Sequence, residues 1–360
     1  MNIAVFDVPA ESGGALSVLS EFHNEVLCHE NKMIQWFFIL STPNLESADN
    51  VKILNFPWIK KSWLHRLYFD YFVAPRLVKK IKVDKIFSLQ NVVVPRTKIE
   101  QIIYMHQSLP FVDYNFTWKE SKISWIYQNV ISKKIYSSIK LSQKAIVQAN
   151  WIKKACIEET GVSEEKLIVV QPQVKMDVKN EDKFSETEES FSTFFYPASF
   201  VFYKNHGIVL EVAKLLKDSG ITRYKVIFTL DPNKCSETMK MYYRAKDSNL
   251  PIEFIGNITR SEVCKYYQKS ILLFPSYVET FGLPILEAKL HESPIIVADC
   301  SFAHEILEGY PNVYYFDPFN AIDLYEKMKF LISNRKYYTV EQHQIELISE
   351  DIIDVILETK

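Results

Sequence analysis

The sequence is poor in cysteine and has no long apolar run. Its five cysteines stand singly along 360 residues, without a CxxC pair or a metal-type spacing to histidine. This usage is typical of reduced thiols in the cytoplasm and argues against a disulfide framework or a zinc site. The longest apolar stretch, near residues 34–40, is far shorter than the ~20 residues of a membrane-spanning helix. The opening MNIAVFDVP also lacks the regions of a signal peptide. We therefore expect a cytoplasmic protein.

A large excess of one charge is absent as well. The formal net charge is -2, which argues against a dedicated nucleic-acid binder, because such proteins carry a strong basic surplus. No Asp-x-Asp occurs in the chain, so the sequence has no motif of paired aspartates that holds a diphosphate through a metal. We expect no metal site and no cofactor.

Short apolar runs alternate with amphipathic stretches along the whole chain. This alternation predicts parallel α/β units, and the length suits two doubly wound, Rossmann-like domains. We expect one domain over 1–173, a second over 174–341, and a C-terminal helix over 342–360 that packs back on the first. Ligands of such folds lie beyond the carboxyl ends of the strands, so two facing domains predict a central cleft. Strands are expected near 3–8, 34–40, 85–89, 101–105, 144–148, 167–171, 194–197, 225–230, 252–255, 271–274, 294–298 and 313–316.

A polar, acidic stretch lies between the two halves. In Lys175–Ser190 only Met176, Val178 and Phe184 interrupt the polar residues. Such a segment cannot bury itself and predicts a linker or an exposed loop. A surface excursion within one domain is the alternative.

The segment FPSYVETFGLPILEA, residues 274–288, carries the clearest chemistry. A buried strand ends at Pro275, a loop carries Glu279, and Gly282 lets the backbone approach a ligand before a helix starts. The free N–H groups of that first turn form an anion site suited to a diphosphate. Glu287 lies about one turn further along, where a carboxylate accepts hydrogen bonds from ribose hydroxyls. A glycosidase pair is disfavoured, since eight helical positions span about 12 Å against the ~5–9.5 Å that such a pair needs.

The spacing of Glu279 and Glu287 in this segment resembles the retaining nucleotide-sugar glycosyltransferases of the B fold, family four, which build bacterial lipopolysaccharide and capsule. Three further segments resemble the same family in order and spacing: FFYPASFVFYKNHGIVLEVAKLL, IEFIGNITRSEVCKYYQKSILLFPS and PIIVADCSFAHEILEGYPNVYYFDPFN. The resemblance implies that Lys204 contacts phosphate and that Glu279 holds the sugar hydroxyls. It also implies donor-binding positions in the second half at Ser199, Asn205, Phe281, Gly282, Leu283 and Glu287.

The first half resembles the family more loosely. VPAESGGALSVL resembles its glycine loop, which implies that Gly13 and Gly14 face the donor phosphates from across the cleft. IIYMHQSLPF ends a strand at His106, which resembles the family's active-site histidine near the transferred sugar. Each feature also has a plainer interpretation, a tight turn for the glycines and a hydrogen-bonded core residue for the histidine.

Two positions depart from the family pattern. Many relatives have an arginine five residues before the phosphate lysine, and Ser199 stands there in this chain. The diphosphate thus loses a bidentate partner. The loop around Ser301–His304 lacks the usual glycines, although Glu305 remains available for the donor.

The resemblance implies metal-independent hexosyl transfer with retention, from a UDP- or GDP-linked sugar to a lipid-linked or oligosaccharide acceptor. Charge on the leaving group is then met by Lys204, the Gly282 helix start and the glycine loop, and closure of the domains excludes water. Three alternatives remain open: another B-fold enzyme such as an epimerase or phosphorylase, a non-catalytic nucleotide-sugar-binding subunit, and a structural or interaction protein.

Basic and aromatic residues interleave in two stretches, near 58–82 and 118–136. At helical spacing, this pattern suits peripheral contact with the cytoplasmic face of the inner membrane, where a lipid-linked acceptor would lie. It equally suits helices whose aromatics face the core and whose lysines face water.

Overall fold

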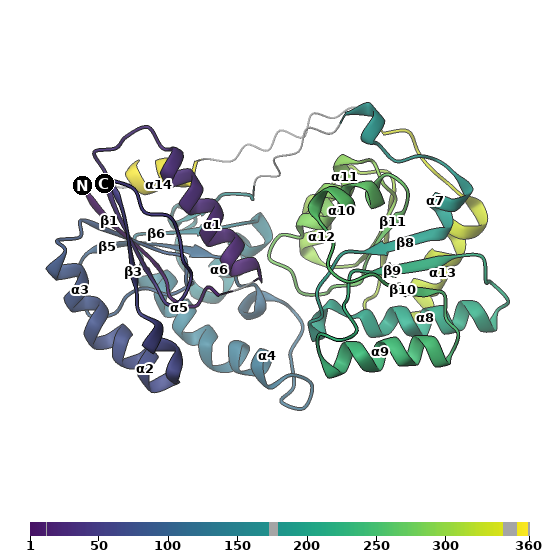
Figure 1. The fold of residues 1–360 in the computed structure, drawn as a ribbon, viewed down its shortest axis with the longest axis horizontal. Helices are drawn as coiled ribbons and strands as arrows, with labels where there is room; N and C mark the ends of the chain where they lie inside the picture. The colour runs from purple at the N-terminus through teal and green to yellow at the C-terminus, as the bar shows by residue number, and fades with distance from the viewer. Residues whose placement is uncertain (12, 173–178, 341–350, 359–360) are drawn as a thin grey trace. The chain divides into compact units, whose positions relative to one another are not determined.

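The computed structural model describes residues 1–11, 13–172, 179–340 and 351–358. Contacts divide the chain into two compact units, one formed by Met1–Gln171 with Ile348–Lys360 and the other by Pro172–Leu347 (Figure 1). We call them unit 1 and unit 2. The predicted domain boundaries at 173/174 and 341/342 fall among residues outside the described part, and they stay predictions. The central cleft also stays a prediction.

Unit 1 is built on a parallel sheet of seven strands in the order β3-β2-β1-β4-β5-β6-β7. The strand order reverses between β1 and β4, as expected of a doubly wound sheet. The strands are β1 (Asn2–Asp7), β2 (Gln35–Leu40), β3 (Val51–Asn55), β4 (Lys85–Ser88), β5 (Glu100–Met105), β6 (Lys144–Val147) and β7 (Leu167–Val169).

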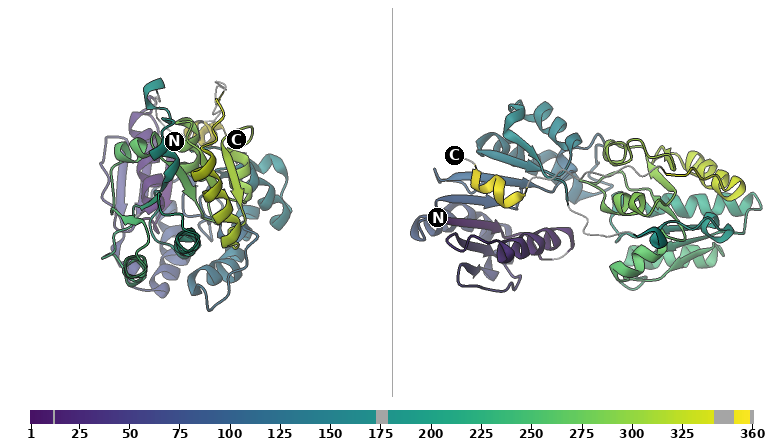
Figure 2. Two further views of the ribbon diagram at one scale, coloured as in Figure 1. Left: turned by 90° about the vertical axis from the view of Figure 1, so that its right-hand side faces the viewer. Right: turned by 90° about the horizontal axis from the view of Figure 1, so that it is seen from above.

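Helices cover both faces of this sheet (Figure 2). Two of them are long and contain one π-helical turn each: Phe69–Val73 joins α2 to α3, and Tyr127–Ile131 joins α4 to α5. The helices of unit 1 are α1 (Gly13–Cys28), α2 (Trp63–Tyr68), α3 (Ala74–Lys80), α4 (Lys122–Ile126), α5 (Ser132–Leu141), α6 (Asn150–Thr160) and α14 (Ile352–Glu358).

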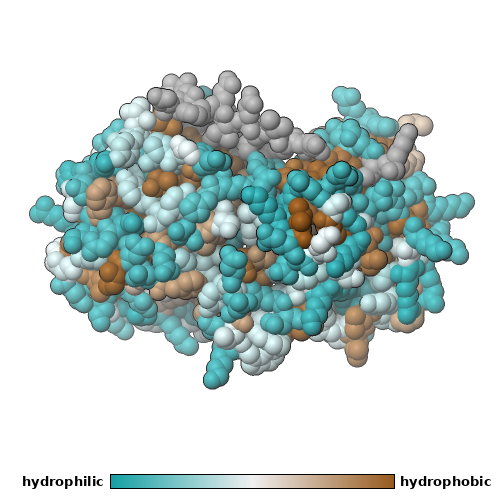
Figure 3. Space-filling model, turned by 180° about the vertical axis from the view of Figure 1, so that it is seen from behind, coloured by the Kyte–Doolittle hydropathy of each residue, from teal (hydrophilic) through white to brown (hydrophobic). Residues whose placement is uncertain are grey.

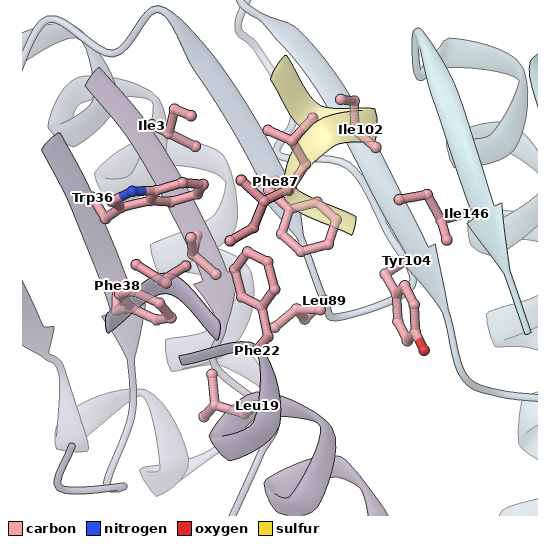
Figure 4. Packing of buried hydrophobic residues seen from close by; sticks show 14 of the residues in the cluster. Ile3, Leu19, Phe22, Trp36, Phe38, Phe87, Leu89, Ile102, Tyr104 and Ile146 are labelled. Carbon is pink, nitrogen blue, oxygen red and sulfur yellow. The ribbon is translucent and has the colours of Figure 1, made fainter. Parts of the chain in front are cut away.

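The core of unit 1 follows the two-residue period of its strands. In β1, Ile3 and Val5 pack on one face, while Ala4 and Phe6 pack on the other, as alternation along a strand requires. On the first face Phe22 of α1 contacts a group of buried aromatic rings (Figure 4). The C-terminal helix α14 buries Ile353, Val355 and Ile356 in the same cluster.

Unit 2 is built on a parallel sheet of six strands in the order β10-β9-β8-β11-β12-β13. Its strand order reverses between β8 and β11. The strands are β8 (Thr193–Tyr196), β9 (Lys225–Phe228), β10 (Ile252–Phe254), β11 (Ile271–Phe274), β12 (Ile295–Ala298) and β13 (Val313–Phe316). The helices are α7 (Glu188–Ser192), α8 (His206–Asp218), α9 (Ser236–Asp247), α10 (Arg260–Tyr267), α11 (Leu283–Leu290), α12 (Ser301–Ile306) and α13 (Ala321–Asn334).

The structure confirms the predicted α/β fold with two doubly wound parallel sheets, but it corrects the stretch Lys175–Ser190. Residues 173–178 lie outside the described part. Of the rest, Phe184 is buried between the rings of Phe191 and Tyr337, at centroid distances of 5.4 and 5.6 Å. This buried aromatic side chain anchors the described part of the stretch to unit 2, together with hydrogen bonds from the Phe184 and Ser185 backbone N–H groups to the His291 and Gln268 carbonyls, where a linker or an exposed loop was expected.

Candidate functional site

The loop that follows β11 carries Glu279, and its side chain forms an ion pair with Lys204. The two residues come from different loops at the carboxyl ends of adjacent strands, β8 and β11. Their side chains are only 19% and 15% exposed. The structure thus brings together the two residues that were predicted to hold the phosphate and the sugar.

Several backbone contacts fix the position of Lys204. It ends the 3₁₀ turn Phe202–Lys204, and its carbonyl oxygen accepts a hydrogen bond from the buried Tyr196 hydroxyl (2.8 Å). The next residue, Asn205, adopts a left-handed conformation (φ 56°) and donates from Nδ2 to the Pro318 carbonyl (2.8 Å). Asparagine tolerates this conformation better than most residues. Asn205 therefore terminates the turn and starts α8.

Gly282 precedes α11 with φ 93°, a conformation that side chains rarely adopt. A Cβ atom added there would lie 3.2 Å from Ile285 Cδ1 and 3.4 Å from Ile306 Cδ1. Both backbone conformation and space therefore require glycine at this position. Next to it, Phe281 is buried and Leu283 is exposed, while Pro284 lies in the first turn of α11.

Glu287 lies on α11 and is largely buried, with 8% of its surface exposed. Arg260 Nη2 donates to its Oε1 (2.9 Å), and the Tyr267 hydroxyl donates to its Oε2 (3.1 Å). Both donors come from α10. The carboxylate is thus held from one neighbouring helix by a cation and a hydroxyl.

The premise used against a glycosidase pair was wrong in one respect. Helix α11 starts at Leu283, so only part of the interval between Glu279 and Glu287 is helical and the 12 Å spacing of an eight-residue helical step does not apply. The two carboxylates instead differ in partner, since one pairs with Lys204 and the other with Arg260.

The two departures from the family pattern are Ser199 and the Ser301–His304 stretch, which forms most of α12. Ser199 is exposed in the loop after β8, and its side chain adds no charge there. Glu305 lies on α12 and is partly buried.

In unit 1 the predicted glycines start α1. Gly13 has φ 62° and both glycines are exposed, with open space around the position of an added Cβ. The left-handed backbone conformation thus favours glycine at position 13. At position 14 no contact within the described residues requires a glycine. Their predicted position opposite the donor phosphates stays a prediction.

His106 directly follows β5. Its backbone N–H donates to Asn91 Oδ1 (2.8 Å), and Asn91 Nδ2 lies 3.2 Å from the ring Nε2. Because the amide nitrogen is a donor, Nε2 accepts, which places the proton of a neutral ring on Nδ1. Burial lowers the pKa of His106 to about 4. The imidazole is therefore neutral at physiological pH.

A group of polar residues near the strand-order reversal of unit 1 was not predicted. Asp7 ends β1 and is fully buried, and neither of its carboxyl oxygens has a hydrogen-bond partner among the described residues. Burial raises its pKa to about 8, although the Ala10 amide and the charges of Arg66 and Lys60 act in the opposite direction. Arg66 also donates to Asp70 Oδ1 (2.9 Å). The only signal in the sequence was a carboxylate closing an otherwise apolar strand.

Within the described residues, no three His, Cys, Asp or Glu side chains lie together in a way that would hold a metal ion. The independence of metal that the resemblance implies stays a prediction.

Comparison with known proteins finds a family match over the part of the chain that carries Lys204, Glu279 and Glu287. Residues 177–346 match the glycosyl transferases group 1 family. The chain is 22% identical over 240 residues to the O-antigen chain mannosyltransferase RfbU of Salmonella typhimurium, covering 66% of this chain and 63% of that protein. It is 27% identical over 148 residues to the N,N'-diacetylbacillosaminyl-diphospho-undecaprenol alpha-1,3-N-acetylgalactosaminyltransferase of Campylobacter jejuni, covering 38% and 39% of the two chains. The matches thus span less than two thirds of either relative.

Solved structures show the same fold over nearly the whole chain. The apo form of the lipopolysaccharide outer core galactosyltransferase WaaB superimposes with a TM-score of 0.67 at 18% identity, covering 94% of this chain and 92% of that one. This likeness extends over both units, whereas the family match covers unit 2. Residues 177–346 therefore match a glycosyl transferases group 1 domain, and the chain as a whole has the fold of that solved glycosyltransferase.

Proposed function

We propose that the chain is a retaining glycosyltransferase that moves a hexose from a nucleoside-diphosphate sugar to a lipid-linked glycan acceptor, in the synthesis of a bacterial surface polysaccharide. One observation carries this proposal: Lys204 and Glu279 meet at the carboxyl edge of the second sheet. A cation for phosphate and a carboxylate for sugar hydroxyls are the two groups that a nucleotide sugar needs side by side.

The catalytic contribution of these residues is electrostatic. In this proposal Lys204 and the N–H groups of the first turn of α11 stabilise the negative charge on the departing diphosphate. Glu279 orients the sugar, and Glu287 holds the ribose. His106, neutral and hydrogen-bonded to Asn91, contacts the transferred sugar from unit 1 as a polar but uncharged group. The acceptor hydroxyl attacks the anomeric carbon as the diphosphate leaves, and the diphosphate takes the proton of that hydroxyl.

The names of the two relatives support the acceptor and the pathway. One is called an O-antigen chain mannosyltransferase, and the other transfers to a diphospho-undecaprenol glycan. We infer a polyprenyl-diphosphate glycan as acceptor for this chain as well, with a UDP- or GDP-linked hexose as donor.

The first experiment measures binding and transfer with the same protein. UDP, GDP and TDP are titrated calorimetrically, and the matching nucleotide sugar is then supplied with a lipid-linked oligosaccharide. We expect one nucleotide to bind, Lys204→Ala to lose that binding, and the exposed-lysine control Lys234→Ala to keep it. The anomeric configuration of the product, read by NMR, tests retention.

The outcomes separate the alternatives. An epimerase would convert the free nucleotide sugar without any acceptor. A non-catalytic subunit would bind the nucleotide and release no product with the acceptor present. Binding of none of the three nucleotides contradicts the proposal.

The acceptor also implies a membrane surface, and α2 with the π-helical turn after it carries an apolar stripe that fits one. Its exposed side chains form three adjacent pairs that repeat every four positions, so they share one side of the helix. They are Trp63 (74% exposed), Leu64 (76%), Leu67 (45%), Tyr68 (54%), Tyr71 (37%) and Phe72 (41%). The interpretation that all aromatics of this stretch face the core was therefore wrong, although Phe69 does face it.

Basic residues flank this stripe. Lys60 and Lys61 precede α2, while Lys79 and Lys80 end α3. Elsewhere the surface is mixed: Figure 3 shows one face on which hydrophilic residues predominate and hydrophobic ones form small groups. No helix in the described part of the chain is long and apolar enough to cross a membrane. Because cations beside exposed Trp and Leu suit an anionic lipid interface, we propose that this stripe docks on the cytoplasmic membrane face.

Vesicle co-sedimentation tests the docking. We expect the protein to sediment with phosphatidylglycerol vesicles and not with neutral phosphatidylcholine vesicles. Trp63→Ser with Leu64→Ser should abolish sedimentation, whereas Leu141→Ser, at a residue equally exposed (72%), should not. Equal sedimentation of all three proteins would refute the role of the stripe.

A further inference from the structure

Helix α10 presents two groups to Glu287 that no motif of the sequence singled out. Arg260 and Tyr267 are seven residues apart, which is about two helical turns, so they lie on the same side of the helix. Arg260 Nη2 is 2.9 Å from Oε1 of Glu287, and the Tyr267 hydroxyl is 3.1 Å from Oε2. Each carboxylate oxygen therefore has one donor.

Among the described residues, this arrangement leaves about half of the carboxylate's hydrogen-bonding capacity unused. An ionised carboxylate has about four lone-pair sites, and Arg260 and Tyr267 occupy two of them, one on each oxygen. One site on each oxygen remains for a ligand. A vicinal diol has two hydroxyl donors at a matching separation, so an oriented carboxylate with one acceptor site on each oxygen fits the 2′- and 3′-hydroxyls of a ribose.

Both donors are themselves held in place. Thr259 and Glu262 form a capping box at the start of α10, in which the Thr259 backbone N–H donates to Glu262 Oε2 (2.8 Å). This fixes the turn that carries Arg260. At the other end Tyr267 is fully buried, and its carbonyl accepts a hydrogen bond from Ser293 Oγ (2.6 Å). The carboxylate is thus held by a fully buried tyrosine and by an arginine on a capped helical turn.

Stability alone does not explain the Arg260 contact. Its side chain is 57% exposed while that of Glu287 is 11% exposed. Ion pairs with so exposed a partner contribute little to folding, because water screens them and the long side chain loses freedom. The contact instead fixes the rotamer of a mostly buried carboxylate and balances its charge.

We propose that Arg260 and Tyr267 are positioning residues that orient Glu287 to recognise a ribose diol, and that they set the preference of the donor site for ribonucleotides over 2′-deoxyribonucleotides. The inference rests on the proposed function, since it assumes a nucleoside diphosphate in this site. It adds Arg260 and Tyr267 as the residues that make Glu287 selective for a ribose.

The test compares the dissociation constants of a nucleoside diphosphate and its 2′-deoxy form, with the nucleotide that the unaltered protein binds. A hydrogen bond to a charged group implies a preference of roughly ten- to a hundredfold for the ribonucleotide. Arg260→Ala and Tyr267→Phe should each reduce that ratio several-fold. Arg260→Lys, which keeps the charge, should restore part of it, and Arg244→Ala, at an exposed arginine on α9, should leave it unchanged.

A merely structural role of Arg260 predicts a loss of stability on substitution in place of a loss of ribose preference. Arg260→Ala should lower the thermal midpoint of the protein without nucleotide by no more than about 4 °C, since an exposed pair is worth under about 1 kcal/mol. If the unaltered protein binds the nucleotide but both variants keep its ribose preference, the inference is wrong and the proposed function stands. A protein that binds the ribo and deoxy forms equally also refutes the inference. Absence of all nucleotide binding contradicts the proposed function itself.

Discussion

Replacing Asp7 by asparagine should stabilise unit 1 by an amount that grows as the pH rises from 5 to 7. The Asp7 carboxyl is fully buried, and burial raises its pKa from 3.8 to about 8. Between these values the folded protein keeps a proton that the unfolded chain has released. Stability therefore falls with rising pH in this window, by the linkage between proton uptake and folding. Asparagine has nearly the same shape and no proton to lose.

The magnitude follows from the two pKa values. While the folded group stays protonated and the unfolded group is ionised, each pH unit changes the free energy of unfolding by about 1.4 kcal/mol. From pH 5 to pH 7 the advantage of Asp7→Asn should thus grow by up to about 3 kcal/mol. Because this is a difference between two pH values, any pH-independent cost of packing the amide cancels.

Tryptophan fluorescence reports this change for unit 1 alone, since all six tryptophans precede residue 172. Urea unfolding is followed at pH 5, 6 and 7 for the unaltered protein, Asp7→Asn and the control Asp113→Asn, at an exposed position. The free energy of unfolding of the control should change with pH in the same way as that of the unaltered protein. A constant difference between Asp7→Asn and the unaltered protein from pH 5 to 7 would show that Asp7 is ionised when folded, which refutes the reasoning.

Three further substitutions test local features. Gly282→Ala should destabilise unit 2 by roughly 1–3 kcal/mol, because φ 93° is strained for alanine; circular dichroism during unfolding measures it, and an unchanged midpoint would contradict it. Above pH 6.5 His106 is neutral in both the folded and the unfolded chain, but as the pH falls towards 4 the unfolded chain takes up a proton that the folded protein excludes. The free energy of unfolding should therefore fall by about 2 kcal/mol between pH 7 and 5, and His106→Gln should remove this loss. If tryptophan fluorescence shows that both proteins lose the same stability in acid, the reasoning is refuted. Asp70→Ala should cost about 3 kcal/mol, because Arg66 and Lys134 then lose their shared buried partner; a loss below 1 kcal/mol in urea would argue against the network.

The fold was largely predictable because buried parallel strands are short continuous apolar runs. The elements that were missed lack that signal. Strand β3 (VKILN) lies at the edge of its sheet and exposes Lys52. Helix α9 is rich in polar residues and buries few side chains, Thr238 and Ala245 among them, so no apolar run marks it in the sequence. Such elements are held by tertiary contacts rather than by their own pattern.

The roles predicted for the site residues stay predictions, and the pairings of these residues could not be predicted from the sequence. A motif identified Glu279, Lys204 and Glu287, yet Lys204 and Glu279 are 75 positions apart, and no local pattern indicates that they pair. Arg260 lies in a segment that resembles the family, but the resemblance assigned it no role, and its contact with Glu287 depends on how α10 packs beside α11. Partners across such distances are fixed by the arrangement of strands and helices, which a single sequence does not state.

The pairing of Lys204 with Glu279 has a consequence for ligand binding. In the structure Glu279 already neutralises the charge of Lys204. Under the proposed roles of these two residues, a bare nucleoside diphosphate must displace Glu279 from Lys204 and leave the carboxylate without its cation. A nucleotide sugar does not incur this cost, because its sugar hydroxyls give the displaced carboxylate new donors. The pair thus favours the complete donor over the product nucleotide.

Glu279→Gln should separate these two effects. Without the competing carboxylate, the affinity for the bare nucleoside diphosphate should rise about three- to fivefold, the worth of a partly screened ion pair. The affinity for the nucleotide sugar should not rise with it, since the amide is a weaker acceptor for hydroxyls than a carboxylate. Calorimetric titration of both ligands measures the ratio, with Glu308→Gln as an exposed control. If Glu279→Gln instead weakens the bare nucleotide as much as the sugar donor, Glu279 does not compete for Lys204, and the pair has no part in selecting the donor.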